Sequence, residues 1–381
     1  MTIVEILFWI TLLFLLYVYG GYVLFTLPFK KKWPVVDKSF RPKCTLLIAA
    51  FNEEKVIAEK IRNSLELEYP EGLIEIVVVA DGSTDRTPQI VSAYPSIKLF
   101  YQPERKGKLA AIQRVLPAIQ SEVVVFTDAN TLLNKNAIKT IVPHFADPGV
   151  GAVSGEKKVH SLESIAGTEG LYWKYESWLK KNDSRFSTIV GAAGELFAVR
   201  SSLYTMVDEN LVLDDFIQSM LICNQGYRVV YEPLAFATEL PSPTLKHEFT
   251  RKVRIAAGGF QAMNYLKNTM NLGKYPRVNF LYYSHRVFRW IPAPFCVFAL
   301  LPLNIGIVLW QRNTFYETIL VIQVFIYILA ILVKKFSISG KIPKFILVVN
   351  YFFLMQIAAI VGLIKYKRQE QTAIWEKIPR N

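Results

Sequence analysis

The chain has 381 residues, of which 52% are hydrophobic and 13% aromatic, and its formal net charge is +13. This composition is too apolar for an ordinary soluble enzyme and too polar for a transporter made only of membrane helices, so we expect a soluble domain with a few membrane spans. The three cysteines lie at unrelated positions and the four histidines are isolated, which argues against a disulfide framework and a zinc site of the usual spacing.

Apolar segments at the two ends of the chain predict a multi-pass protein of the cell membrane. Residues 6–27 precede a basic cluster and have no Ala-x-Ala-like site, so we interpret them as an anchor rather than a signal peptide. Three more runs each approach the ~20 residues that cross a bilayer; they cover residues 291–310, 315–333 and 345–364. The predicted organisation is an anchor at 1–29, a domain at 30–285 with a membrane-proximal helix near 245–270, membrane segments at 286–366 and a basic tail at 367–381.

Much of the positive charge lies next to these apolar runs, at residues 30–32, 334–335 and 365–368. We therefore interpret it as membrane topology, with membrane lipids as partners and no nucleic acid. The positive-inside rule places such clusters, and with them the large domain, in the cytoplasm. Three complete C-terminal crossings would place the last cluster outside, so either one segment does not cross or the rule fails there.

The predicted elements of the large domain alternate between strands and helices. In chain order they are a strand at 44–50, a helix at 53–67 with Asn52 as its N-cap, a strand at 73–80, a short helix ending near Ala93, a strand at 97–101, a helix at 108–119, a strand at 123–127, a helix at 136–145 and a strand at 150–154. This order predicts an α/β fold with a Rossmann-like, mainly parallel sheet. Ligands of such sheets bind at the carboxyl ends of the strands.

The second half of the domain has a more mixed pattern. We expect an aromatic-rich helix at 162–181, a glycine-permitted loop at 191–194 that enters a strand ending at Arg200, a helix at 216–224, a strand at 227–231 and a long helix at 245–266.

Acidic residues follow two of the predicted strands. Asp81 begins an Asp-Gly-Ser-Thr-Asp turn in which Asp85 is placed to cap the next helix, so turn chemistry and binding of a ribose or base are both open. Asp128 ends another strand and Asn130 follows two residues later. Oxygen ligands with this spacing can hold Mg²⁺ together with a diphosphate, although a turn cap would use the same residues.

Later charged residues supply candidates for catalysis. Asp214 and Asp215 are adjacent, so their repulsion can raise one pKa and suit a general base, while one of them is expected to cap a helix. Arg251 and Arg254 share a helix face, where they could stabilise a leaving diphosphate or lie at a membrane surface. Lys108, at the end of a basic loop, could pair with a nucleotide diphosphate.

Taken in order, these motifs resemble the family 2 glycosyltransferases of the GT-A fold, in particular the membrane-bound cellulose, hyaluronan and poly-N-acetylglucosamine synthases. The resemblance covers roughly residues 43–260. Its motifs are Ile48-Ala-Ala-Phe-Asn-Glu53, Asp81-Gly-Ser-Thr-Asp85, Lys106-Gly-Lys108, Thr127-Asp-Ala-Asn130, Gly191-Ala-Ala-Gly194, Asp214-Asp215 and Arg251-Lys-Val-Arg254.

The resemblance implies a role for each matched position. The implied donor site comprises Phe51, Glu53, Asp81, Lys108, Asp128 and Arg251, the metal ligands are Asp128 and Asn130, and the catalytic residues are Asp215 as base, its neighbour Asp214, and Arg254. The chain departs from the family pattern at two places. Asn130 stands where the family has a second metal-binding Asp, and the Gln-x-x-Arg-Trp motif lacks both its Gln and its Trp.

The implied function is inverting, Mg²⁺- or Mn²⁺-dependent transfer of a sugar from a nucleotide-sugar, expected to be UDP-linked, to a saccharide or lipid-linked acceptor hydroxyl at the cytoplasmic membrane face. It would serve synthesis of a cell-surface polysaccharide or glycoconjugate. Two alternatives stay open: a polyprenyl-phosphate glycosyltransferase, whose anionic acceptor needs little base catalysis, and an inactive nucleotide-binding membrane scaffold.

Overall fold

A computed structural model describes residues 2–31, 36–159, 164–242, 244–267, 273–336 and 343–372. Several predicted features therefore lie partly outside the described residues: Lys32 of the first basic cluster, the start of the helix expected from 162, the end of the helix expected near 245–270, and residues 373–381 of the basic tail.

The centre of the large domain is one eight-stranded sheet with the strand order β3-β2-β1-β4-β7-β6-β8-β5. Its strands are β1 (Cys44–Ala50), β2 (Ile74–Asp81), β3 (Ile97–Gln102), β4 (Val123–Asp128), β5 (Thr131–Leu133), β6 (Val150–Val159), β7 (Phe197–Arg200) and β8 (Arg228–Glu239). The first four strands are parallel, as predicted. The other half is mixed, because β7 runs antiparallel to both β4 and β6 while β6 and β8 are parallel.

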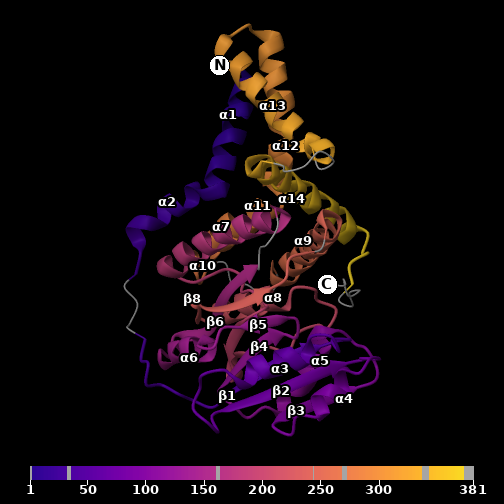
Figure 1. Ribbon diagram of the computed structural model, residues 1–381. Coiled ribbons are helices and arrows are strands. Elements are labelled where there is room, and N and C mark those ends of the chain that lie inside the picture. The colour runs from indigo at the N-terminus through magenta and orange to yellow at the C-terminus, as the bar shows by residue number, and fades with distance from the viewer. Residues whose placement is uncertain are drawn as a thin grey trace.

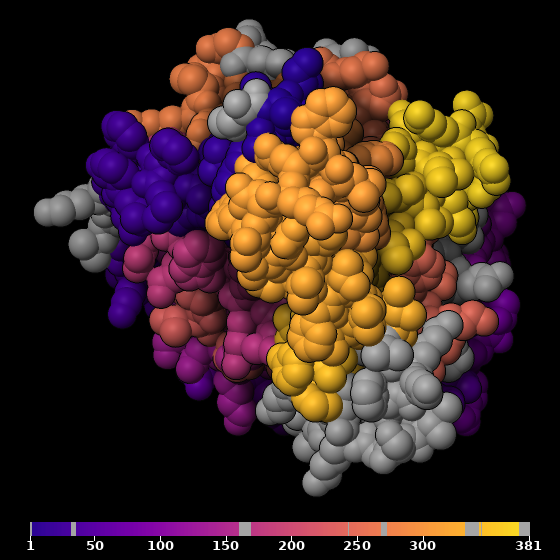
Figure 2. All heavy atoms as spheres, turned by 90° about the horizontal axis from the view of Figure 1, so that it is seen from above, coloured from indigo at the N-terminus to yellow at the C-terminus, as the bar shows by residue number. Residues whose placement is uncertain are grey.

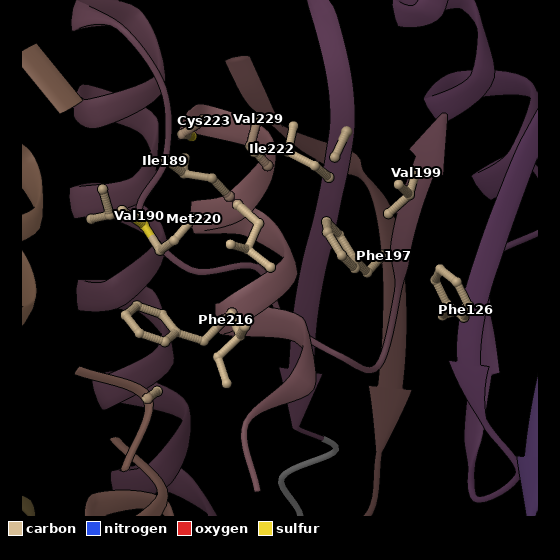
Figure 3. Packing of buried hydrophobic residues seen from close by; sticks show 14 of the residues in the cluster. Phe126, Ile189, Val190, Phe197, Val199, Phe216, Met220, Ile222, Cys223 and Val229 are labelled. Atoms are coloured by element: carbon tan, nitrogen blue, oxygen red, sulfur yellow. The ribbon is translucent and has the colours of Figure 1, made fainter. Parts of the chain in front are cut away.

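Helices cover both faces of this sheet (Figure 1). The helices of the large domain are α3 (Ile57–Leu65), α4 (Thr87–Ser92), α5 (Lys108–Val115), α6 (Ala137–Ile141), α7 (Ser164–Phe186), α8 (Asp214–Asn224), α9 (Leu245–Lys267) and α10 (Pro276–Leu281). Alternate residues of each strand point to opposite faces, so Ile48 packs in a cluster with Ile57 and Ile61 of α3. On the other face, Figure 3 shows Phe197 between Phe126 of the sheet and the side chains of Phe216 and Met220 on α8, and all four belong to one buried cluster.

Four segments are long and apolar enough to cross a membrane: residues 3–29, 292–310, 314–331 and 345–367. The first contains α1 (Ile3–Leu16), a kink at Gly20 and α2 (Tyr22–Thr26), and the others contain α12 (Pro292–Trp310), α13 (Thr314–Phe336) and α14 (Lys344–Lys367). A short helix, α11 (Phe288–Trp290), precedes α12.

The four apolar helices do not form one parallel bundle. Helices α1, α12 and α13 gather at one end of the molecule, whereas α14 lies obliquely between them and α9 (Figure 1). Seen from that end, the C-terminal part of α14 lies to one side of the bundle (Figure 2). The contact with α9 is close: a Cβ at Gly362 would lie 2.5 Å from the Ala256 Cβ. Helix α14 therefore lies over the large domain.

Two local predictions were wrong. The helix expected from Glu53 begins at Ile57 and its N-cap is Val56, not Asn52. Asn52 instead has a φ of 53° and its side-chain oxygen accepts hydrogen bonds from the backbone of Thr84 and Asp85. The Asx side chain therefore joins two loops of the sheet edge rather than starting a helix.

Candidate active site

The carboxyl ends of β1, β2 and β4 meet at one edge of the sheet, as the parallel order requires. Asp81, at the end of β2, is buried, and its carboxylate accepts hydrogen bonds from the backbone N–H groups of Lys106 and Gly107, the latter at 2.7 Å. The Arg114 guanidinium lies 3.9 Å away. Asp81 therefore orders the Arg105–Lys108 loop beside this edge.

The loop after β1 forms the next part of this edge. The Arg105 guanidinium lies 3.6 Å from the centre of the Phe51 ring. Gly82 has a φ of 66°, and a Cβ there would approach the Arg105 Cβ to 2.5 Å, so glycine is required on both counts. Glu53 is buried, and its backbone N–H donates to the Thr87 hydroxyl. These contacts fix the loops that carry Phe51, Glu53 and Asp81, three of the residues predicted for the donor site.

Asp128 and Lys108 form the charged centre of the edge. Lys108 Nζ lies 2.5 Å from Asp128 Oδ1, and both side chains are about 30% exposed (28% and 31%). Burial disfavours the Lys108 charge, but the carboxylates of Asp128, Asp214 and Asp215 outweigh it and raise the pKa of Lys108. Lys108 at the start of α5 and Asp128 at the end of β4 thus lie together, and the ammonium group of Lys108 is available for a nucleotide diphosphate.

Asp214 and Asp215 begin α8 and lie near this centre, because a small cavity of about 10 Å³ is lined by both of them and by Lys108. Burial, and then repulsion by Asp214, raise the pKa of Asp215 to about 7. Asp215 Oδ1 also accepts a hydrogen bond from the backbone N–H of Phe216 at 2.8 Å. The expected helix cap was wrong, because the N-cap of α8 is Leu213 and both aspartates lie in the first turn of the helix. The pair instead provides a carboxyl group with a pKa raised to about 7.

The glycine loop before β7 makes room for this carboxyl group. A Cβ at Gly194 would lie 3.0 Å from Asp215 Oδ2, which is tighter than side chains normally pack. Gly191 has a φ of 98° and lies against the Phe216 ring. The glycines of the Gly191–Gly194 loop thus allow its backbone to pack close to the start of α8.

The two arginines of α9 have different surroundings. Arg254 interacts electrostatically with Asp214, Asp128 and Asp215, although burial dominates and lowers its pKa. Arg251 pairs with Glu169 of α7 at 2.6 Å and with Glu248 at 2.9 Å. Arg254 is therefore close enough to the aspartates of the site to interact with them electrostatically. Arg251 is instead held in ion pairs with Glu169 and Glu248.

Hard oxygen ligands for a divalent cation occur at the end of β4. The Asp128 carboxylate is partly exposed and Asn130 follows it before β5 begins. No group of three His, Cys, Asp or Glu side chains within the described residues could hold a metal by itself. The residues fit a cation that takes most of its oxygen ligands from a bound diphosphate and water, as Mg²⁺ does.

Two buried charged groups were missed by the sequence analysis. Lys60 is fully buried in α3, and its Nζ donates to the Thr127 hydroxyl and the Thr131 carbonyl at the base of the Asp128 loop. Its place on the apolar face of the helix, between Ile57 and Ile61, was a visible signal. Lys157 of β6 pairs with Glu195 and Glu239, which come from distant parts of the chain.

A larger cavity of about 420 Å³ lies beside Asp215, on the side facing α14. Its lining comes from α7, the Gly191–Ala193 loop, α9, the segment around α11 and α14. Ile255, which stands where the family motif has Trp, lines it, and so does Trp290, whose ring packs on Phe216 with the centroids 5.4 Å apart. Asp215 therefore borders the strand-end edge and this second space.

Comparison with known proteins finds similar sequences and a similar fold. A protein-family model described as "Glycosyl transferase family 2" matches residues 45–205. A poly-beta-1,6-N-acetyl-D-glucosamine synthase of Staphylococcus aureus (strain COL) is 27% identical over 228 residues, which cover 58% of this chain and 55% of that protein. A beta-monoglucosyldiacylglycerol synthase of Nostoc sp. is 32% identical over 163 residues, 41% of this chain and 34% of that one. The chain thus spans about half the length of the first of these relatives, and a third of the second.

A solved structure matches the fold over nearly the whole chain. The mannosyltransferase PcManGT from Pyrobaculum calidifontis, in complex with GDP-Man and Mn²⁺, superposes with a TM-score of 0.76 and covers 97% of this chain and 100% of its own, at 21% sequence identity. Residues 45–205 therefore match the family 2 glycosyltransferases, in a GT-A-like fold joined to helices long and apolar enough to cross a membrane.

Proposed function

We propose that the protein transfers a sugar, with inversion, from a nucleotide-sugar to an acceptor hydroxyl at the cytoplasmic face of a membrane. The observation that carries this proposal is the meeting of Asp128, Lys108 and the Asp214-Asp215 pair at one end of the sheet. A cation and carboxylates at strand ends suit a nucleotide diphosphate with its metal.

The proposed donor site uses the residues predicted from the sequence apart from Arg251, which is paired with Glu169 and Glu248. Phe51, Glu53 and Asp81 surround the position for the base and ribose, and the loop that Asp81 orders closes one side of it. Lys108 and Arg254 supply positive charge where the diphosphate would lie. A UDP-linked donor is our first choice.

The metal belongs to the same part of the site. Asp128 and Asn130 would hold Mg²⁺ or Mn²⁺, and the bound cation would neutralise charge on the departing diphosphate. Support comes from the oxygen ligands at the end of β4 and from the Mn²⁺ in the PcManGT complex.

Asp215 acts as the general base. It takes the proton from the acceptor hydroxyl as the hydroxyl oxygen forms a bond to the anomeric carbon. The bond between that carbon and the diphosphate oxygen breaks on the opposite face, so an α-linked donor gives a β-linked product. A base with a pKa of about 7 suits proton removal from a hydroxyl near neutral pH, which favours this reaction over transfer to an already ionised phosphate.

The arrangement of α14 supports the cytoplasmic orientation and removes the conflict over the last basic cluster. Helices α12 and α13 follow each other with only residues 311–313 between them, so they can cross and return. The C-terminal end of α14 then packs on the large domain, where the Tyr366 and Phe260 rings stack with centroids 6.2 Å apart. If α14 lies along the domain instead of crossing, all three basic clusters face the cytoplasm.

A donor screen tests the proposed reaction. Purified protein in nanodiscs is incubated with UDP- and GDP-linked sugars, with Mg²⁺ or Mn²⁺ or with a chelator, and release of the nucleoside diphosphate is measured. We expect metal-dependent release with one class of donor, and a product whose anomeric configuration is inverted. A protein that binds donor but releases no diphosphate under any condition would instead be the inactive scaffold.

A further inference from the structure

The cavity beside Asp215 has two chemically different ends. Asp215 and the Gly191–Ala193 loop form the end next to the reaction. At the other end the wall is apolar and comes from α14, through Val348, Phe352 and Met355. Since α14 is apolar enough for a membrane segment, a molecule in this cavity would contact the reacting groups with one end and a membrane helix with the other.

The walls between these ends carry an excess of positive charge. Cations in the lining outnumber carboxylates by five to three; the cations are Lys180, Arg251, Lys252, Arg286 and Arg289, and the carboxylates are Glu176, Glu195 and Asp215. Two of these cations are paired outside the lining: Arg251 with Glu169 and Glu248, and Lys252 with Glu248. The excess therefore rests on Lys180, Arg286 and Arg289. Glu195 is already paired with Lys157 outside the cavity, and Glu176 is shared by two arginines, Arg286 at 3.5 Å and Arg289 at 2.7 Å.

Lys180 is the cation that points most directly to a ligand. Its residue is only 5% exposed, and no carboxylate of the described residues lies within 4 Å of its ammonium group. Its ammonium lies 6.0 Å from the centroid of the Tyr231 ring. The carboxylates of Glu176, Glu156 and Glu195 act on this ammonium only from a distance, and burial and Arg286 outweigh them. An anion bound directly to it in the cavity would therefore lower the free energy of this arrangement.

Of the two acceptor classes, a free saccharide fits this cavity poorly. A neutral sugar would not compensate the buried cations, and it would leave the apolar α14 wall against polar hydroxyl groups. The lining within the described residues takes nothing from α12 or α13, so this cavity does not continue between those two helices. An amphiphile that stays in the membrane satisfies all three observations.

We propose that the acceptor is a membrane lipid whose headgroup carries both a phosphate and a free hydroxyl. The inference rests on the proposed function, because it assigns the acceptor of the same reaction. The hydroxyl lies at Asp215, the phosphate is held by Lys180 with Arg286 and Arg289, and the lipid chain follows Met355 and Phe352 along α14.

Binding tests the site without any turnover. Native mass spectrometry of the full-length protein, released from detergent, compares retention of phosphatidylglycerol, which has a phosphate and free hydroxyls, with that of neutral diacylglycerol. Ala359 lines the cavity and is 9% exposed, whereas Ile357, two residues away, is 44% exposed and does not line it. We expect Ala359→Trp to reduce phosphatidylglycerol retention at least fivefold and Ile357→Trp to leave it unchanged.

A second variant tests the charge. Lys180→Gln keeps much of the side-chain volume and removes the ammonium group, so the preference for phosphatidylglycerol over diacylglycerol should fall to less than half. Both binding results are also measured in Asp215→Asn, which should retain the lipid as well as the unchanged protein does. Equal retention of both lipids by the unchanged protein, or equal effects of Ala359→Trp and Ile357→Trp, would overturn the proposal.

Transfer of a labelled sugar separates the lipid proposal from the proposed function. Products made in nanodiscs are divided into a solvent-extractable fraction and a soluble oligosaccharide fraction. Label in the lipid fraction, reduced at least tenfold by Ala359→Trp with nucleotide affinity retained, supports both. Label only in soluble saccharide overturns the lipid acceptor and leaves glycosyl transfer intact. Selective lipid retention without transfer from any donor supports the lipid site and contradicts the proposed function.

Discussion

Asp214 and Asp215 are adjacent in the chain but have different tasks in this account. Asp215 borders both the strand-end edge and the acceptor cavity, and its pKa is raised to about 7 by burial and by Asp214. Asp214 acts through charge, because it interacts electrostatically with Lys108 and Arg254 as well. We therefore assign Asp215 as the base and Asp214 as the neighbour whose charge raises the pKa of Asp215.

The first prediction concerns the pH dependence of transfer. A base must be ionised, so kcat/KM should fall as the pH drops through about 7, where Asp215 becomes protonated. Asp214→Asn removes one cause of the raised pKa and leaves burial and the charge of Glu195, so the midpoint of this fall should move to lower pH. An unchanged or higher midpoint, measured from pH 5 to 9, would contradict the role given to Asp214.

A second prediction concerns the metal. As a metal ligand Asn130 would contribute an amide oxygen, where a carboxylate would add a negative charge, and affinity for hard cations rises with the number of charged ligands. Asn130→Asp should therefore lower the Mg²⁺ or Mn²⁺ concentration for half-maximal nucleotide release by roughly tenfold. The same half-maximal concentration in both proteins would show that residue 130 does not reach the cation.

Two of the chemistry-bearing residues could be found from the sequence because each ends a strand whose direction is fixed by the parallel order. These are Asp81 and Asp128, and the structure places both at the same edge. The use of Asp81 to order the Lys106-Gly107 loop could not be found, since it depends on backbone N–H groups 25 and 26 residues away. The burial of Lys60 could have been seen, but its partners could not, because an apolar helix face does not show which buried hydroxyl or carbonyl an ammonium group will reach.

At the scale of elements, α14 is the part of the fold that its own sequence describes least well. Length and hydropathy predict a membrane span, and the structure shows a helix that packs along α9 and lines the 420 Å³ cavity beside Asp215. Hydropathy measures only whether a helix can leave water, so it does not separate a bilayer from the apolar surface of α9. The irregular Asn52 loop was missed for a similar reason, since its partner is a distant turn.

The contact between α14 and α9 can be tested with a matched pair of glycines. A Cβ at Gly362 would lie 2.5 Å from the Ala256 Cβ and 2.9 Å from the Ala257 nitrogen. Gly362→Ala should therefore destabilise the protein by about 1–3 kcal/mol, the usual cost of overpacking. At Gly306, a Cβ meets only Val4 Cγ1 at 3.7 Å, so Gly306→Ala should leave the thermal midpoint in detergent unchanged or slightly higher. Equal midpoints for the two variants would show that α14 is not held against α9.

At the scale of the whole molecule, the account predicts a topology in which the end of α14 and the large domain share one side of the membrane. Labelling of intact cells by a membrane-impermeant maleimide checks this after Cys296 is replaced by alanine; Cys44 and Cys223 are buried. Arg312→Cys, between α12 and α13, should be labelled, whereas Glu370→Cys, after α14, should be labelled only in broken cells. Labelling of Glu370→Cys in intact cells would mean that α14 crosses.

The central claim is that Asp215 is the base of a glycosyl transfer, and the variant Asp215→Asn tests it most directly. The amide keeps the shape of the side chain but does not take a proton, and the donor groups around Asp128 and Lys108 stay in place. The decisive measurement is single-turnover transfer of labelled sugar together with donor affinity. We predict that Asp215→Asn lowers the transfer rate at least a thousandfold while donor affinity changes less than threefold. Transfer at a rate close to that of the unchanged protein would contradict the account.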